Sequence, residues 1–240
     1  MTTVKVCDAI MGSGKSQSAI AYMNEHSQRK FVYITPYLDE TKRIQEACPS
    51  LRFVCPSKEE EEDGSGWTKI QHIRRLIAEG RNVSTTHAAF RLCTSEILEG
   101  VKARGYTLII DEAVQVLGKL KVDSKAVDIL SEAGYIDIHE NGSVEILKDF
   151  RCSTYDDLYC VGQRNNLVRV LDGEGRDQND VLYYSELPAE FITSFADVFV
   201  LTYLFAGSEM KCYFDLKGIP YEYIGVARDE NGYHFAPTNE

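Results

Sequence analysis

Short apolar runs alternate with stretches of helical periodicity along most of the chain. The runs are rich in β-branched residues and are bounded by glycine, proline or polar residues, a pattern that predicts strands. They occupy residues 4–10, 31–35, 51–55, 82–85, 106–110, 198–202 and 221–226.

Helical periodicity fills several of the intervals between these runs. Residues 67–79 place apolar side chains at positions 67, 70, 73, 76 and 77, on one helical face, and Gly80 ends the pattern. Further helices are expected over 17–25, over the polar stretch from Pro36 to Ala47, and over 87–92. The alternation predicts an α/β fold with a mostly parallel central sheet and helices on both of its faces.

The segment from about 118 to 190 has a different pattern. Residues 135–139 and 143–147 flank Glu140-Asn141-Gly142, which predicts a β-hairpin. A helix with a broken middle is expected over 155–171, a turn over 172–175 and a short strand over 181–184. We interpret 118–190 as an α+β insertion between two strands of the main sheet, within a single domain spanning 1–240.

A glycine-rich loop lies between the first predicted strand and the first predicted helix. The pattern of a phosphate-binding loop is GxxxxGK[ST], and this loop matches it from Gly14 onward, with Ala9 at the first position. Glycines let backbone N–H groups turn towards phosphate oxygens, and the helix N-terminus faces the same anion. A glycine turn beside a surface lysine is the alternative, but the strand before it and the helix after it favour a nucleotide site. Its expected members are Met11, Gly12, Ser13, Gly14, Lys15, Ser16 and Gln17.

A pair of carboxylates ends the apolar run at 106–110. Asp111 is placed to bind magnesium together with the Ser16 hydroxyl, and Glu112 is placed to polarise an attacking water as a general base. The alternative is an ordinary helix N-cap region. Because a phosphate loop precedes this pair, we expect ATP and Mg²⁺ as ligands, with Lys15, Asp111 and Glu112 as the catalytic residues.

The order of these motifs resembles that of superfamily 2 helicases, most closely the DEAD/DEAH-like helicases of bacteriophages. Residues 11–16 resemble motif I, Asp111-Glu112-Ala113 resembles motif II with Val114 in the fourth position, and Leu201-Thr202-Tyr203 stands at motif III. The resemblance implies the first RecA-like ATPase domain of a helicase. It also implies that Thr202 couples the nucleotide state to strand movement.

Two further segments resemble the nucleic-acid motifs of that family. Thr35-Pro36-Tyr37 resembles motif Ia, and Ser84-Thr85-Thr86-His87 resembles motif Ib, with Thr85, Thr86 and His87 as its expected contacts. The resemblance implies binding of single-stranded DNA or RNA through its backbone, which hydroxyls and amides can contact without reading bases. Ordinary structural roles remain open: Thr35 as a strand end, His87 as a helix-start residue and Thr202 as a buried strand residue.

The arginine motif of the family's second RecA-like domain has no counterpart. No QxxGRxxR-like run occurs, and Gly162-Gln163-Arg164 is a poor match. The resemblance therefore implies that a second RecA-like domain or a partner chain completes the ATP site, because an arginine from that side stabilises the transferred phosphate. We expect slow hydrolysis and poor unwinding by this chain alone.

Composition, net charge and the start of the sequence indicate which class of protein to expect and where it is located. Hydrophobic residues make up 44% of the 240 residues, which suits a globular core, and no apolar run is long enough to span a membrane. The net charge of −11 is evidence against a tight autonomous nucleic-acid binder, although part of it lies in the acidic run at 59–63. With no signal peptide at the start, we expect a cytoplasmic protein, in the bacterial host cytoplasm if phage-encoded.

Two other function classes stay open. A nucleoside kinase of the thymidine-kinase type also carries a GKS loop and a later Asp-Glu pair. That family holds a structural zinc with CxxC pairs, whereas the seven cysteines here form none, so we expect no zinc. An ATP-switched binding module would keep the loop without needing Glu112.

Overall fold

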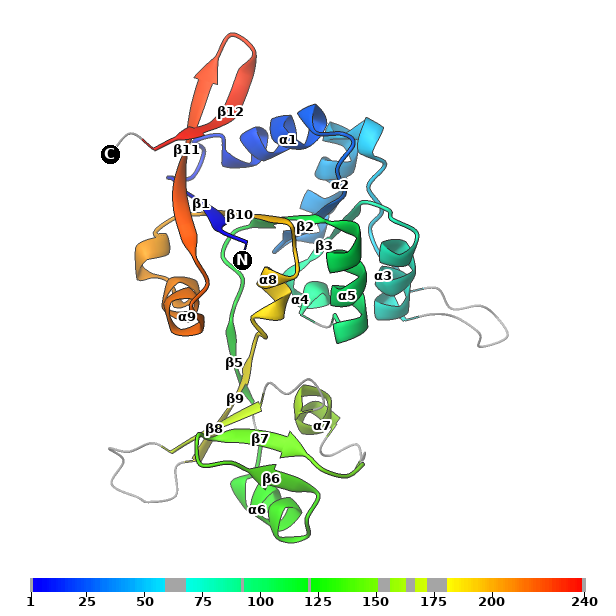
Figure 1. Cartoon of the computed structure of the whole chain (residues 1–240), viewed down its shortest axis with the longest axis vertical. Coiled ribbons are helices and arrows are strands. Elements are labelled where there is room, and N and C mark those ends of the chain that lie inside the picture. Colours follow the sequence, from blue (N-terminus) through cyan, green and yellow to red (C-terminus); the bar gives the residue numbers. More distant parts are fainter. Residues whose placement is uncertain are drawn as a thin grey trace. The chain divides into compact units, whose positions relative to one another are not determined.

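The computed structural model describes residues 2–58, 68–91, 93–120, 122–150, 156–162, 167–171 and 181–238. The chain divides into two compact units (Figure 1). The first combines Met1–Val114 with Ala189–Glu240, and the second is Gln115–Pro188, close to the range 118–190 expected for an insertion.

A seven-stranded sheet forms the centre of the first unit. Its strand order is β12-β11-β1-β10-β4-β2-β3, and every neighbouring pair is parallel except β11 with β12. This confirms the α/β class with a mostly parallel sheet. The strands are β1 (Val4–Asp8), β2 (Phe31–Thr35), β3 (Val83–Thr86), β4 (Thr107–Asp111), β10 (Asp197–Thr202), β11 (Tyr221–Asp229) and β12 (Gly232–Pro237).

Helices cover both faces of this sheet (Figure 1). Ile20 and Met23 of α1 and Ile44 of α2 pack on one face with Tyr33 and Ile109. On the other face, helices α3 and α5 pack against each other and against the sheet. The helices are α1 (Lys15–Glu25), α2 (Leu38–Ala47), α3 (Lys69–Ala78), α4 (His87–Phe90), α5 (Ser95–Arg104), α8 (Glu190–Thr193) and α9 (Glu209–Lys217), with 3₁₀ turns η1 (Pro49–Leu51) and η2 (Phe205–Gly207).

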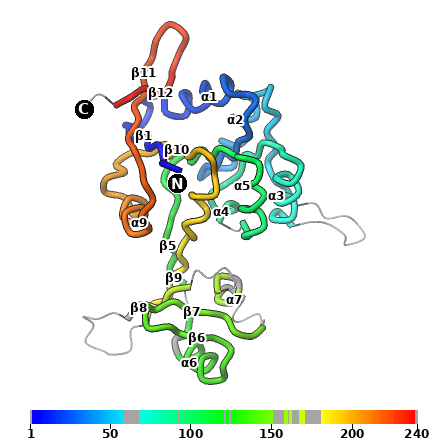
Figure 2. Tube along the Cα trace, viewed as in Figure 1, coloured from blue at the N-terminus to red at the C-terminus, as the bar shows by residue number. Residues whose placement is uncertain are grey.

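The central strands are apolar throughout because they are covered on both sides. All five residues of β2 and of β4 are buried, as expected for inner strands of a parallel sheet. Figure 2 shows that β1, β10 and β11 lie side by side although they are far apart in the chain. Val4 pairs with Val198 on one side and with Tyr221 on the other.

Several predicted elements differ from the structure. The strand expected over 51–55 is wrong: the 3₁₀ turn η1 and the left-handed Arg52 (φ 50°) interrupt it, leaving a single bridge from Val54 to Val83. The helix expected over 155–171 is present as α7 over Asp156–Gly162 and is wrong at Leu167–Leu171, where a segment with Val168 and Val170 forms strand β8. Residues 155 and 163–166 of this expected helix, and the turn expected over 172–175, lie outside the described residues. Helices α5 and α9 and strand β12 were not predicted.

The second unit is built on a five-stranded antiparallel sheet of order β5-β9-β8-β7-β6. The expected hairpin is confirmed by β6 and β7, joined through Gly142 in a left-handed conformation (φ 83°). Val127, Leu158 and Tyr183 belong to its own core. Its elements are β5 (Leu117–Leu120), α6 (Ser124–Glu132), β6 (Ile136–Ile138), β7 (Ser143–Ile146), α7 (Asp156–Gly162), β8 (Leu167–Leu171) and β9 (Val181–Glu186).

None of the helices in the described parts of the chain is both long and apolar enough to cross a membrane.

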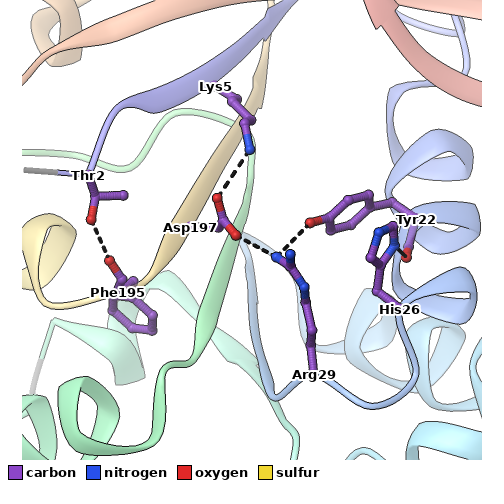
Figure 3. A network of polar contacts seen from close by, with 7 residues as sticks. All are labelled: Thr2, Lys5, Tyr22, His26, Arg29, Phe195 and Asp197. Atoms are coloured by element: carbon purple, nitrogen blue, oxygen red, sulfur yellow. Dashed lines mark hydrogen bonds and ion pairs between the residues drawn. The ribbon is translucent and has the colours of Figure 1, made fainter.

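An ion-pair network joins the starting ends of β1 and β10 to the loop after α1 (Figure 3). Asp197 accepts from Lys5 Nζ at 3.1 Å and from Arg29, while Arg29 also donates to the Tyr22 hydroxyl at 3.0 Å. The network connects the starting ends of two strands whose opposite ends lie at the candidate site.

We expect Asp197→Ala to lower the free energy of unfolding by about 1–2 kcal/mol, because it leaves two cations facing each other without their shared carboxylate. Chemical denaturation measures this change. Asp39→Ala is the matched control, since Asp39 forms an exposed pair with Lys42 at 3.7 Å. If the two substitutions lowered the free energy of unfolding equally, the network would stabilise the fold no more than an ordinary exposed ion pair does.

Candidate nucleotide site

A cavity of about 280 Å³ opens at the edge of the sheet where the parallel strands end. Carboxyl ends of parallel strands are the usual ligand-binding edge of an open α/β sheet. Its lining brings together the loop after β1, the start of α1, the end of β4, and two residues from elsewhere. The lining residues are Met11, Gly12, Gly14, Lys15, Ser16, Gln17, Arg43, Asp111, Glu112 and Tyr233.

The glycine loop has the backbone that a phosphate cradle requires. Gly12 (φ 78°) and Gly14 (φ 96°) are left-handed, a conformation that glycine adopts without steric cost. Gly14 is the N-cap of α1, no described side chain caps this helix, and its first turn contains no acidic residue. The helix therefore presents uncapped N–H groups and a positive dipole end to the cavity.

A second feature of the loop fits a polar ligand. The Ser13 hydroxyl oxygen is buried and has no hydrogen-bond partner among the described residues. Buried hydroxyls without partners are rare, because losing hydration without compensation is costly. The loop thus holds at least one polar atom that a bound ligand could satisfy.

Lys15 is buried, and its ammonium group turns back onto its own loop. Its Nζ donates to the Ala9 carbonyl at 2.5 Å and to the Ile10 carbonyl at 3.1 Å. A buried ammonium needs such acceptors. These two bonds hold the charge at the mouth of the loop, where an anion could replace the carbonyl groups.

Asp111 connects the two halves of the site. Its Oδ1 accepts from the Ser16 hydroxyl at 3.2 Å and its Oδ2 accepts from the Tyr33 hydroxyl at 2.8 Å. Burial raises the pKa of Asp111 above its ordinary value, while the bonds from Tyr33 and Ser16 work in the opposite direction. The structure therefore brings together the two residues expected to hold magnesium, and their oxygens are the hard donors that Mg²⁺ prefers.

Glu112 lies beside Asp111 in an unusual backbone conformation. Its φ of 64° is left-handed, which costs a residue with a side chain roughly 1–2 kcal/mol. Its N–H donates to the Leu201 carbonyl at 2.8 Å, which holds the turn in place. Burial, and then the charge of Asp111, raise the pKa of Glu112, whereas Lys15 lowers it. Such strain is concentrated at functional sites in proteins.

Strand β10 lies between β1 and β4 and bonds to both of the site's loops. The Thr202 carbonyl accepts from the Ala9 N–H at 3.1 Å, next to the bond from Glu112 to Leu201. Thr202 itself is buried. The end of β10 therefore supports the phosphate loop on one side and the carboxylate turn on the other.

The residues expected to bind nucleic acid fall into two groups. Thr35 and Thr85 are buried, and their hydroxyls have no partner among the described residues, so neither side chain is presented at the surface. Pro36 and Tyr37, by contrast, are exposed. In the segment Thr35-Pro36-Tyr37, the residues open to a ligand are therefore Pro36 and Tyr37.

The second expected segment, at the end of β3, lies next to the first, because Thr35 of β2 pairs with Thr86 of β3. The Thr86 hydroxyl accepts from the Ala89 N–H at 3.3 Å and so caps α4. His87 Nε2 lies 2.9 Å from the Asp111 carbonyl oxygen, and burial lowers the pKa of His87. A neutral His87 with its proton on Nε2 donates this bond, which ties the segment to the carboxylate turn.

Arg43 and Tyr233 line the cavity and were not expected there. Arg43 belongs to the polar helix α2, where an arginine looks like part of a solvated face. Tyr233 comes from the β11–β12 hairpin, and its ring lies so close to Gly14 that a side chain at position 14 would overlap it. No local pattern in the sequence signals either residue, since both arrive through tertiary packing.

Comparison with known proteins gives one informative match. The chain is 32% identical over 246 aligned residues to the SPbeta prophage-derived uncharacterized protein YonV of Bacillus subtilis strain 168. The match covers 97% of this chain and 56% of that protein, so the chain spans little more than half the length of this relative. Neither a protein-family model nor a solved structure matches the chain.

We expect Asp111→Asn to raise the melting temperature at pH 7 by roughly 2–4 °C, measured without divalent cations. A raised pKa means that the folded state favours the protonated carboxyl, so ionisation of Asp111 at neutral pH lowers the free energy of unfolding. The uncharged amide of the variant avoids this loss. The advantage of the variant should shrink as the pH falls towards that pKa.

The exposed Asp39→Asn is the control for this experiment and should show no such pH-dependent gain. A variant less stable than the wild type at pH 7 would mean that the bonds from Ser16 and Tyr33 outweigh the burial of the charge.

Proposed function

We propose that this chain is the RecA-like ATPase part of a nucleic-acid helicase or translocase, which hydrolyses ATP with Mg²⁺ and couples hydrolysis to single-stranded nucleic acid. The observation that carries the proposal is the contact between Ser16 and Asp111, at 3.2 Å, in the cavity that also contains Lys15 and Glu112. It joins the glycine loop to the carboxylate pair across 95 residues of sequence.

The phosphate chain of the nucleotide is bound by the loop and the N-terminus of α1. Uncapped N–H groups, the helix dipole and Lys15 all favour an anion at this position. Lys15 exchanges the Ala9 and Ile10 carbonyls for phosphate oxygens. The Ser13 hydroxyl is a further donor available to the ligand.

Ser16 and Asp111 hold the metal. A bound Mg²⁺ neutralises charge that develops on the phosphates during transfer. Asp111 is kept in position by the Tyr33 hydroxyl, so its carboxylate does not need to reorganise when the ion enters. Glu112 orients and deprotonates the attacking water, and its raised pKa makes it a better base than an ordinary glutamate.

Coupling of ATP hydrolysis to nucleic acid is supported by the residues that lie at the same edge of the sheet as the nucleotide site. Exposed Tyr37 follows β2, and His87 connects the neighbouring segment to the Asp111 carbonyl. A nucleic-acid strand bound over Tyr37 and over Thr86 and His87 would therefore lie next to the hydrogen bond from His87 to the Asp111 carbonyl. An aromatic side chain is a suitable platform for an unpaired base.

A partner on this edge is supported by its apolar surface. Large apolar side chains follow the ends of three parallel strands and remain exposed: Ile10, Met11, Tyr37, Leu38, Tyr203 and Leu204. Such groups are common where another protein surface docks. A second RecA-like domain or a partner chain on this edge would complete the ATP site, in line with the greater length of the prophage relative, whose origin also fits a bacteriophage source.

We expect Lys15→Ala to reduce ATP affinity at least about tenfold, the loss typical of a charge-assisted phosphate contact. Glu112→Gln should bind ATP as the wild type does and lose most turnover. Binding of a fluorescent ATP analogue and release of phosphate measure the two effects.

Wild-type ATP affinity in Lys15→Ala would contradict the phosphate loop, and unchanged turnover in Glu112→Gln would remove Glu112 as the base. Transfer of phosphate to a nucleoside instead of water would favour a kinase. Tight ATP binding with no turnover in the wild type would favour an ATP-switched binding module.

We expect single-stranded DNA or RNA to stimulate the ATPase rate several-fold, and Tyr37→Ala to weaken this stimulation while leaving the basal rate unchanged. Leu216→Ala is a suitable control, since Leu216 is an exposed apolar residue of α9, outside the two expected nucleic-acid segments. Stimulation that is absent, or equal in Tyr37→Ala and the wild type, would contradict the assignment of this edge.

A further inference from the structure

Helix α2 places a second cation in the nucleotide cavity. Arg43 lines it together with Lys15, Ser16, Asp111 and Glu112, although it comes from a different element than either motif. Lys15 approaches from the glycine loop, whereas Arg43 approaches from the helix that follows β2. The cavity thus has positive groups on separate walls.

The carboxyl groups around this cavity favour a further cation beside Lys15 and Mg²⁺ once a triphosphate is bound. Asp111 and Glu112 already place two carboxyl groups in the lining. A terminal phosphate adjacent to them adds like charge in a partly desolvated space, where repulsion is stronger than in water. Arg43 lines the same cavity as these two carboxyl groups.

Glu40 holds the Arg43 side chain in a defined orientation. Its Oε2 accepts from Arg43 Nε at 2.7 Å and from Nη2 at 2.6 Å, one turn earlier on the same helix. Two bonds to one carboxylate fix the plane of the guanidinium and leave the remaining donors free to bind another anion. Lysine could not be held in this way.

We propose that Arg43 binds the terminal phosphate of the nucleotide and thereby distinguishes the triphosphate from the diphosphate. This inference rests on the proposed ATPase function and extends it. Arg43 supplies, from within this chain, part of the positive charge at the phosphates. From the sequence, this charge was expected to come from a second RecA-like domain or a partner chain. Because α2 begins directly after the exposed Tyr37, the same helix joins the terminal phosphate to the edge expected to bind nucleic acid.

Two plainer roles for Arg43 make different predictions. A solvated helix pair with Glu40 would leave nucleotide affinity unaffected, and a contact with nucleic acid would change only the affinity for the strand. The position of Arg43 in the lining of the phosphate cavity, beside both carboxylates, favours the nucleotide contact over both.

The test compares affinities for a non-hydrolysable ATP analogue and for ADP, both with Mg²⁺, in the full chain. Arg43→Ala should weaken binding of the triphosphate analogue about tenfold or more and change ADP affinity less than about twofold, as expected for one lost charge-assisted contact. Arg43→Lys, which keeps the charge but not the fork, should fall between the wild type and Arg43→Ala.

Lys42→Ala is the matched control, because Lys42 is the neighbouring cation on the same helix, is well exposed and pairs with Asp39. It should leave both affinities unchanged. Equal losses for the triphosphate analogue and ADP in Arg43→Ala, or none, would overturn the inference, as would a change confined to nucleic-acid affinity.

Lys15→Ala separates this inference from the proposed function. If Lys15→Ala weakens binding of the nucleotides at least about tenfold while Arg43→Ala has no selective effect, the ATPase site stands and only the role of Arg43 fails. If Lys15→Ala binds both nucleotides normally, the nucleotide site itself fails and the role of Arg43 with it.

Discussion

The buried carboxylate of Asp111 is the group on which the arrangement of the candidate site depends. It accepts hydrogen bonds from Ser16, at the start of the helix after the glycine loop, and from Tyr33 in the middle of β2. A buried carboxylate is costly unless its oxygens are satisfied, so both donors are drawn to it. One side chain thereby connects three elements that are remote in sequence, α1, β2 and β4.

The backbone around Asp111 extends this arrangement. Strand β10 receives bonds from Ala9 on one side and from Glu112 on the other, so the two loops of the site share one support. The left-handed Glu112 is a conformational cost that these bonds offset. The site is therefore pre-organised by main-chain contacts as well as by the side-chain bonds of Asp111.

The sequence predicted those parts of the fold that local physics decides. Strands β2 and β10 were placed to within a residue because strands covered on both faces are apolar throughout, and Gly12 and Gly14 were recognisable because the loop needs their conformations. The sequence did not reveal Arg43 or Tyr233 in the cavity, since neither lies in a local pattern. Nor did it reveal that Thr35 and Thr85 point inward, because hydroxyl-bearing residues at strand ends look alike whether buried or exposed.

The pairing of β1 has a consequence for how the protein is made. Val4 pairs with Val198 and Tyr221, and Tyr233 packs against Gly14, so the first strand and its loop have no place to dock until the last quarter of the chain has been synthesised. Contacts of such sequence separation are slow to form, because the intervening chain loses entropy when the loop closes. The second unit has a core of its own and local pairings, and can fold first as the chain leaves the ribosome. The phosphate loop is thus translated well before the strands and the hairpin against which it packs, and it reaches its native environment only after they have been made.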